Sequence, residues 1–453
     1  MTVFPVCPVR CTEPGSSRRG IPETCDQGRR SPDEPSPVGL DFSAARPRCH
    51  SNEDKIHPRR RDPPLASLSM DSRTAFDGFG DFAGRTWLNT AHQGPLPLDA
   101  AKEAYEAIAW KLAPHELTGA RFEDVPLPLR TALGRLVNAR PDEIVLGNSA
   151  SYGLHVIANA YPWQEGDEIL VMAGDFPSDL LPWLMIERRC GARVVRIQPR
   201  NHVIAPDELE GAITPRTRVF CTTWVHSFSG FSIDLDALGA ICRSRGVAFV
   251  VNCSQALGAR PIDLTRAPVD AMSCAGWKWL CGPYGTGFCW IAPQLRERLG
   301  RVKAYWLSLQ TAEDLGNEIA DPVVPDRQGA RSLEIFAPAN FFNFKPWAAA
   351  VEFLLGKGIE CIRDHDEALV EHFIAGLDPD RFEVLSPRQK GLMRSTLVFF
   401  SHRDRARNRA IHAGLSQAGI DIALRGGLLR VSPHLHNSSG DITRTLAVLN
   451  ESS

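Results

Sequence analysis

Two hydrophobic periods alternate along the chain from about residue 97 onward. Apolar residues recur at helical spacing in segments 96–112 and 127–139, whereas several later segments are short, uninterrupted apolar runs typical of buried strands. The strand-like runs are EIVLG (143–147), EILVM (168–172), ARVVRIQ (192–198), TRVFCTTW (217–224) and VAFVVNC (247–253). Helical segments fall between most of them, at 151–161, 178–191 and 234–246. This alternation predicts an α/β fold with a mainly parallel central sheet that is covered on both faces.

The pattern changes after about residue 345 and suits a smaller α+β domain. Its helical segments lie at 346–359 and 368–377. Two strand-like runs follow at 394–401 and 428–432, and a final helix comes after them. We therefore expect a large domain over residues 70–335, with an N-terminal arm at 70–110, and a small C-terminal domain over residues 336–453.

The first 69 residues show neither period for more than a few positions. They hold 11 of the 34 prolines and no tryptophan, so they cannot bury enough apolar surface to offset the entropy lost on ordering. We expect residues 1–69 to be a disordered extension. The arginine content leaves a transit peptide open, and a translation start at Met70 is the interpretation that we favour.

Charge and apolar run length exclude several classes of protein. The chain has 453 residues with 51 Lys+Arg against 53 Asp+Glu, a formal net charge of -2. It therefore has no overall field to attract nucleic acid or an anionic membrane. No apolar run approaches the ~18 residues of a membrane span. We expect a soluble small-molecule protein with neither nucleic acid nor membrane as a partner.

The twelve cysteines do not form a recognisable metal or disulfide pattern. No CxxC pair and no Cys/His zinc spacing occurs, so no metal site is expected. Most of the eight cysteines after residue 69 lie in apolar stretches, such as Cys221 and Cys289, where a free thiol packs as a small hydrophobe. This usage is typical of a reducing compartment, and we expect the protein in the cytoplasm.

In a parallel sheet, ligands bind beyond the carboxyl ends of the strands, so the residues after each strand are the candidates for chemistry. Ser149, Ala150 and Ser151 follow one strand and begin a helix, which makes an anion site, although an ordinary serine N-cap has the same sequence. Lys278 lies between two tryptophans, before a glycine-rich turn. Partial desolvation would lower its pKa and suit it to Schiff-base chemistry, although a surface lysine with a buried stem is the simpler alternative.

Together these segments resemble the class V aminotransferases, a family of pyridoxal phosphate enzymes that includes isopenicillin N epimerase and the cysteine desulfurases. The resemblance covers about residues 85–450. Its motifs, in chain order, are LNTAHQGPLP, GNSASYGLHVIANAY, GDEILVMAGDFPSDLLPW, WVHSFSGFSIDL, VVNCSQALGARPIDL, VDAMSCAGWKWLCGPYGTGF and LLRVSPHLHNSSGDI. The resemblance implies fold type I, pyridoxal 5'-phosphate as the cofactor and a homodimer with sites at the subunit interface.

The resemblance also assigns roles around the cofactor. Lys278 would form the internal aldimine and then move protons at the substrate α-carbon. Ser149, Ala150 and Ser151 would hold the phosphate at a helix N-terminus. Phe176 would stack on the pyridine ring, at a position where the family often has histidine.

Further roles concern the substrate and the rest of the pocket. Gln255 would bind the phenolic oxygen of the cofactor, and Ser227 would also contact the cofactor. Arg430 would take the substrate carboxylate, with Asn89 and His226 near the substrate. The other pocket residues expected from the resemblance are His92, Trp277 and Tyr284.

Asn252 departs from the family, which normally has aspartate there to keep the pyridine nitrogen protonated. A neutral amide cannot supply that charge, so the ring should be a weaker electron sink. Transamination depends most on this sink. We therefore favour epimerase or lyase chemistry over transamination.

Two other departures concern sulfur chemistry and the phosphate. Desulfurases of the family carry a nucleophilic cysteine on a loop of the small domain, but the segment from Arg425 to Arg430 has no cysteine and little room for a loop. Cys361 lies in an amphipathic helical segment, where we expect it in the core. We therefore reject a cysteine desulfurase. Ala337 replaces a residue whose hydroxyl, in the family, often reaches the phosphate of the neighbouring subunit.

The sequence thus predicts a pyridoxal-phosphate-dependent enzyme that acts at the α-carbon of an amino acid or an amino-acid-like metabolite. A class V aminotransferase and a catalytically weak homologue that binds the cofactor remain as alternatives. A dinucleotide-binding oxidoreductase is disfavoured because no GxGxxG follows a predicted strand. The sequence does not identify the substrate.

Overall fold

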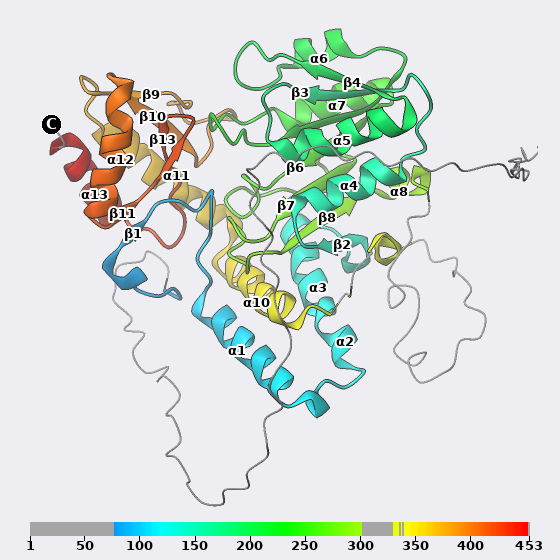
Figure 1. The fold of residues 1–453 in the computed structure, drawn as a ribbon, viewed down its shortest axis with the longest axis horizontal. Coiled ribbons are helices and arrows are strands. Elements are labelled where there is room, and N and C mark those ends of the chain that lie inside the picture. Colours follow the sequence, from blue (N-terminus) through cyan, green and yellow to red (C-terminus); the bar gives the residue numbers. More distant parts are fainter. Residues whose placement is uncertain (1–76, 301–328, 335–336, 338, 452–453) are drawn as a thin grey trace, which may run out of the picture. The chain divides into compact units, whose positions relative to one another are not determined.

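A seven-stranded sheet forms the centre of the larger part of the fold (Figure 1). The computed structural model describes residues 77–300, 329–334, 337 and 339–451, so the expectations for residues 1–69 lie outside the described residues. The strands, in order across the sheet, are β2 (Ile144–Gly147), β8 (Gly287–Ile291), β7 (Ala271–Ala275), β6 (Ala248–Asn252), β5 (Thr217–Thr223), β3 (Glu168–Met172) and β4 (Arg193–Ile197). The pairs from β7 to β4 are parallel, and β8 is antiparallel to both β7 and β2. The predicted mainly parallel sheet is confirmed.

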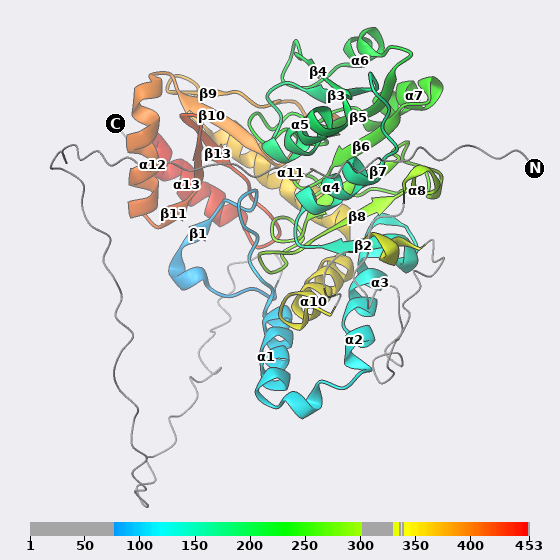
Figure 2. The same cartoon turned by 45° about the vertical axis from the view of Figure 1, so that its right-hand side comes forward.

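Helices cover both faces of this sheet, because successive strand residues point to opposite sides. In β5, Phe220 belongs to the hydrophobic cluster with α3, α7 and α10, whereas Val219 and Cys221 pack towards α4 and α5. Figure 2 shows α4 and α5 in front of the strands. The helices of this part are α1 (Leu98–Leu112), α2 (Arg121–Asp124), α3 (Pro126–Val137), α4 (Ala150–Ala160), α5 (Pro177–Cys190), α6 (Pro206–Ala212), α7 (Leu235–Arg245), α8 (Pro293–Arg298) and α10 (Phe341–Lys357).

A four-stranded antiparallel sheet and three helices make up the C-terminal part. Its strands, in order, are β12 (Ala423–Arg425), β13 (Leu428–Val431), β10 (Val398–His402) and β9 (Phe382–Val384), and its helices are α11 (Ile359–Gly376), α12 (Asn408–Gln417) and α13 (Ser439–Glu451). The N-terminal strand β1 (Thr86–Trp87) pairs in parallel with β11 (Ile420–Asp421), which ties the start of the described chain to this part. Helix α10 packs against α1 and α3 of the larger part.

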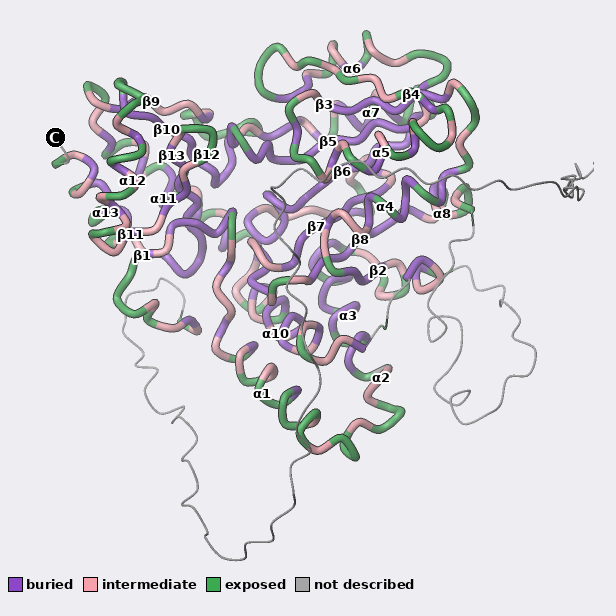
Figure 3. Tube along the Cα trace, in the orientation of Figure 1, coloured by how far each residue is buried: buried purple, intermediate pink, exposed green. Residues whose placement is uncertain are grey.

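Burial follows the predicted apolar runs (Figure 3). All residues of β2, β3, β6, β7 and β8 are buried, as expected for strands covered on both faces. Cys221 and Cys289 are buried as expected. The expectation for Cys361 was wrong: this thiol is exposed, because it lies near the start of α11 on the face away from the buried residues Ile359 and Ile362.

Among the residues that the structure describes, no helix is long and apolar enough to cross a membrane. The described chain also contains no cluster of three or more histidine, cysteine or acidic side chains that could hold a metal ion.

Candidate active site

The loops that follow the strands of the large sheet meet the tip of the β12–β13 hairpin around one pocket of about 450 Å³. This is the edge where ligands bind in open parallel sheets. The lining residues are Ala91, His92, Gln93, Ser149, Ala150, Ser151, Phe176, Ser178, Thr223, Ser227, Phe228, Asn252, Ser254, Gln255, Ala275, Trp277, Lys278, Tyr284, Arg425 and Arg430. The structure therefore brings together most of the site residues chosen from sequence, although they extend from His92 to Arg430 in the chain.

Lys278 lies just after β7, in a loop held from several sides. Gly94 donates its N–H to the Trp277 carbonyl at 2.9 Å, and a Cβ on Gly94 would lie 1.9 Å from the Lys278 carbonyl oxygen. On the other side, the Trp279 indole donates to Gln255 Oε1 at 3.0 Å. The close backbone approach at Gly94 is the reason that no side chain fits there. These contacts fix the lysine backbone while the amine faces the pocket.

Burial, and then the neighbouring Arg430, lower the pKa of Lys278 to about 8. The amine lies 5.6 Å from the ring centroid of Phe176. An amine with this pKa is partly neutral near pH 7, and a neutral amine can attack a carbonyl carbon. The arrangement therefore suits Schiff-base formation, as the sequence predicted for Lys278.

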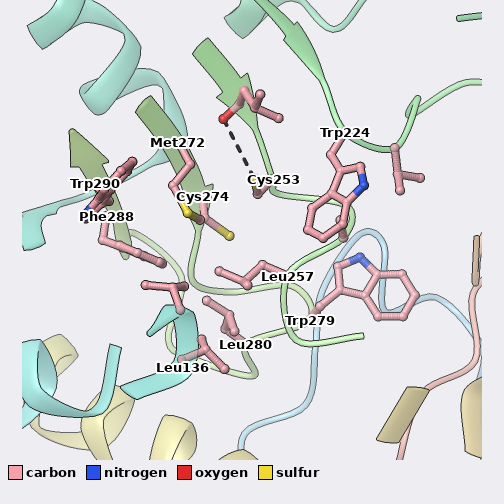
Figure 4. Close-up of a cluster of buried hydrophobic side chains, with 14 of the residues drawn as sticks. Leu136, Trp224, Cys253, Leu257, Met272, Cys274, Trp279, Leu280, Phe288 and Trp290 are labelled. Atoms are coloured by element: carbon pink, nitrogen blue, oxygen red, sulfur yellow. Dashed lines mark hydrogen bonds between the residues drawn. The ribbon is translucent and has the colours of Figure 1, made fainter. Parts of the chain in front are cut away.

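Buried hydrophobic side chains support the loops that carry Asn252 and Lys278. The next residues in sequence, Cys253 and Trp279, are buried side chains (Figure 4). They belong to a cluster that includes Leu257, Met272, Leu280 and Phe288. The side chains of Asn252 and Lys278 therefore extend from backbone that is anchored in the hydrophobic core.

The N-terminus of α4 forms one end of the pocket. Ser149 is its N-cap and accepts the Tyr152 N–H at 3.3 Å, so its hydroxyl has the ordinary capping role. Ser151 donates its hydroxyl to Ser178 at 2.9 Å. The first backbone N–H groups of a helix have no partner within it, so those of Ala150 and Ser151 can bind an anion.

Phe176 lies at the start of α5 and packs against Phe228. Their ring centroids are 6.1 Å apart at an interplanar angle of 22°. Phe176 remains 38% exposed, because its other face is open to the pocket. A flat apolar surface between the α4 N-terminus and Lys278 can support an aromatic ring.

Asn252 ends β6 and is only 4% exposed. Its Nδ2 donates to Asp179 Oδ1 at 2.7 Å, and its Oδ1 accepts the Ser254 N–H at 3.0 Å. Asp179 is completely buried in the first turn of α5, behind the pocket wall. The Asn252 amide thus lies between the pocket and the buried carboxyl group of Asp179.

Arg430 on β13 is 3% exposed and donates to Asn89 Oδ1 at 3.1 Å. Its Nε has no acceptor among the described residues. Burial, and then Arg425, lower the pKa of Arg430 to about 9. Arg430 pairs with Ala423 across the hairpin, and Arg425 is two residues further along β12, so both arginines lie on the same face. No carboxylate lines the pocket in the part of the chain that the structure describes, so this face is positively charged.

Two residues predicted for the substrate do not line the pocket. Asn89 lies behind Arg430 and holds its guanidinium group. His226 is buried, with Nδ1 at 2.8 Å from the Ser229 hydroxyl and Nε2 at 3.2 Å from the Gly174 carbonyl. Burial lowers the pKa of His226. Both side chains support neighbouring groups in this structure.

Gln255 lines the pocket, but its amide is largely occupied. Its Nε2 donates to the Ala91 carbonyl at 3.1 Å, and its Oε1 accepts the Trp279 indole N–H. The second Nε2 hydrogen has no acceptor among the described residues and can serve a ligand.

Sequence reasoning did not single out Arg425 or Asp179 as site residues. Arg425 could have been found by extending the alternation of the strand from Ala423, which places positions 423 and 425 on the same face. Asp179 carried no such signal, because an acid in the first turn of a helix is usually exposed and interacts with the helix dipole.

The pocket fits pyridoxal phosphate. The α4 N-terminus can receive the phosphate, Phe176 can cover the ring, and Lys278 can meet the aldehyde. The buried Arg430, whose Nε has no acceptor in the described part of the chain, can bind a substrate carboxylate.

This chain is similar to several known proteins. A profile of the family described as aminotransferase class-V matches residues 117–437. The chain is 28% identical over 295 residues to isopenicillin N epimerase from Streptomyces clavuligerus, which covers 63% of this chain and 73% of that protein. It is 25% identical over 328 residues to a probable cysteine desulfurase from Methanothermobacter thermautotrophicus, with 69% and 80% covered.

Solved structures share the fold. The cystine C-S lyase C-DES, in complex with its reaction product cysteine persulfide, aligns with a TM-score of 0.74 at 21% identity, covering 82% of this chain and 98% of the other. The cysteine desulfurase CsdA from Escherichia coli aligns with a TM-score of 0.70 at 20% identity, covering 82% and 96%. The family profile spans more than half of the chain, so the protein belongs to the class V aminotransferases, a family of pyridoxal-phosphate-dependent enzymes of fold type I.

Proposed function

We propose that the protein uses pyridoxal phosphate to act at the α-carbon of an amino acid or an amino-acid-like metabolite, as an epimerase or a lyase rather than a transaminase. The observation that carries this proposal is the pocket itself. It places an amine with a pKa of about 8 opposite a helix N-terminus and beside a buried arginine.

Four groups of this chain would hold the cofactor. The N-terminus of α4 would bind the phosphate, Phe176 would cover the ring, Asn252 would meet the ring nitrogen and Gln255 would offer one N–H to the phenolic oxygen. Ser227 lines the same pocket and would also contact the cofactor. When bound, pyridoxal phosphate draws electrons from the substrate α-carbon and so weakens a bond there.

Lys278 and Arg430 act on the substrate. Arg430, held by Asn89, binds the substrate carboxylate and thereby fixes the position of the α-carbon. Lys278, whose amine is partly neutral near pH 7, accepts the proton from the α-carbon. In an epimerase a proton returns to the opposite face, and in a lyase a leaving group departs from the β-carbon. No carboxylate in the described pocket lining competes for the cationic groups.

Asn252 favours these reactions over transamination, because its amide does not carry the negative charge that keeps a ring nitrogen protonated. Replacement of this amide by Asn252→Asp should shift the products towards transamination. An unchanged product ratio would contradict this part of the proposal. The relative named isopenicillin N epimerase supports epimerase chemistry.

The β12–β13 hairpin argues against desulfurase chemistry. Only Gly426 and Gly427 connect the two strands, with φ of 56° and 79°. These positive φ values form a tight turn, and the turn leaves no loop for a nucleophilic cysteine. Transamination stays as the alternative, and a weak homologue that only binds the cofactor is the second alternative.

The proposal includes a homodimer in the cytoplasm. Tyr284 and Phe228 line the pocket and are 73% and 43% exposed. Large apolar side chains at a pocket mouth are typical of a surface that a second subunit covers. We also propose that the subunit divides into two domains, one for each sheet, with helix α10 packed in the large domain.

The test is product analysis in deuterated water with a panel of amino acids. Deuterium at the α-carbon with inverted configuration indicates an epimerase, and a keto acid with ammonia indicates a lyase. A keto acid with retention of the amino group on the cofactor indicates a transaminase. No change with any substrate would favour the weak homologue. Lys278→Ala should abolish every product, whereas Lys102→Ala, an exposed lysine in α1, is the matched control.

A further inference from the structure

Two buried acids lie behind Asn252, and the proposed function does not use them. Asp175 is 6% exposed and Asp179 is completely buried. Asp175 is satisfied as an anion, because it accepts the Phe176 N–H at 2.8 Å, the Thr223 N–H at 3.0 Å and the Thr222 hydroxyl at 3.2 Å. Two adjacent carboxyl groups without solvent cannot both ionise easily.

Asp179 accepts fewer hydrogen bonds than Asp175, so its ionised form is less stabilised. Its Oδ1 accepts one N–H, from Asn252, and its Oδ2 receives no donor from the described residues. Burial, and then the charge of Asp175, raise the pKa of Asp179 well above its ordinary value. Burial also raises the pKa of Asp175, to about 6. The pair therefore holds one proton near neutral pH, and the hydrogen-bond donors place that proton on Asp179.

Other charged and titratable groups near Asp179 do not change this assignment. Lys278, across the pocket wall, favours the ionised acid but contributes less than burial and Asp175. The thiols of Cys221 and Cys253 are buried, and burial raises the pKa of each, so they remain neutral.

The orientation of the Asn252 amide follows from its fixed neighbours. The Ser254 backbone N–H can only donate, so the atom that faces it must be the amide oxygen. Nδ2 then faces Asp179, whose Oδ1 acts as an acceptor whether or not Oδ2 carries a proton. The second N–H of Asn252 has no acceptor among the described residues, and Asn252 lines the pocket.

We propose that Asp179 is a positioning residue that accepts one N–H of Asn252 and so directs the other N–H to the ring nitrogen of the bound cofactor, which is held unprotonated. This inference rests on the proposed cofactor orientation. An ionised aspartate at position 252 would accept a hydrogen bond from a protonated ring nitrogen. Asn252, held by Asp179, instead donates a hydrogen bond to an unprotonated ring nitrogen. Asp179 thus makes this end of the pocket a hydrogen-bond donor to the ring nitrogen, where an aspartate at position 252 would make it an acceptor.

The test is ¹⁵N NMR of the full-length holoenzyme reconstituted with pyridoxal phosphate labelled at the ring nitrogen. The wild type should give the resonance of an unprotonated pyridine, and Asn252→Asp should give that of a protonated one. Asp179→Asn is the matched control. Its amide oxygen still accepts from Asn252 and its NH₂ can donate to Asp175, so its resonance should match the wild type.

Asp179→Leu removes the acceptor and keeps the branched shape of the side chain. It should weaken cofactor binding about tenfold, measured by absorbance titration, because about one hydrogen bond is lost, and Asp179→Asn should bind as tightly as the wild type. A protonated ring nitrogen in the wild type would overturn the inference, and this measurement does not depend on any variant folding. Wild-type affinity in Asp179→Leu would also overturn it. A wild-type protein that binds no cofactor would instead refute the proposed function.

Discussion

The buried proton on Asp179 has a measurable cost for folding. In the unfolded chain an aspartate loses its proton near its ordinary pKa of 3.8, whereas in the folded protein burial raises the pKa of Asp175 to about 6 and raises that of Asp179 well above its ordinary value. The folded state therefore binds more protons than the unfolded state above pH 3.8. The free energy of unfolding must fall as pH rises through this range.

The size of the effect follows from the pH interval. Each pH unit above 3.8 over which folded Asp179 keeps its proton costs about 1.4 kcal/mol relative to the unfolded chain. Asp179→Asn removes the titrating group and keeps the hydrogen bond to Asn252. We expect the variant to be more stable than the wild type, by an amount that grows as the pH rises above 3.8.

Urea unfolding of the full chain at half-unit steps between pH 4.5 and 7 measures this difference. Asp236→Asn is the control, since Asp236 is an exposed acid in the first turn of α7. A difference between Asp179→Asn and the wild type that stays constant with pH would refute a proton held on Asp179. A less stable variant at pH 6 would refute it as well.

Three further predictions concern charged groups. Arg430→Gln should move the pH of half-maximal reaction of Lys278 with pyridoxal phosphate above 8, because Arg430 lowers that pKa, and an unmoved profile would contradict the electrostatic coupling. Glu334→Ala should lower the free energy of unfolding by about 3–5 kcal/mol in urea, because Arg130 then stays buried without its ion pair, and a loss below 1 kcal/mol would refute this role. Arg425→Ala should raise KM about fivefold with little change in kcat, since an exposed pocket cation aids binding of an anionic substrate, and a kcat effect alone would argue against that role.

Much of the fold was predictable from the sequence, because the strand runs are short, apolar and separated by helices. The buried runs at 143–147, 168–172 and 247–253 correspond to strands β2, β3 and β6. The antiparallel placement of β2 and β8 was not predictable, because antiparallel and parallel buried strands have the same apolar pattern.

The pocket was predictable where a residue directly follows a strand. Ser151 and Lys278 were identified in this way and Asn252 through the family resemblance, and all three line the pocket. Residues that act through another side chain were not predictable to the same degree. Asn89 is expected near the substrate, and the structure places its side chain against Arg430.

Side-chain burial within helices was the weakest part of the prediction. Cys361 was expected in the core but is exposed, because the buried residues of α11 next to it, Ile359 and Ile362, lie on the other face of the helix. Asp179 had the opposite outcome: it is polar in the sequence but fully buried. Tertiary packing decided both positions, and local periodicity does not contain that information.

The central claim is that Lys278 binds pyridoxal phosphate covalently. The direct test is reduction of the holoenzyme with borohydride, digestion, and mass spectrometry of the peptides. The account predicts the pyridoxyl group on the peptide that contains Lys278 and no labelled peptide after Lys278→Ala. A label on another lysine, or no label on a protein that was saturated with the cofactor, would contradict it.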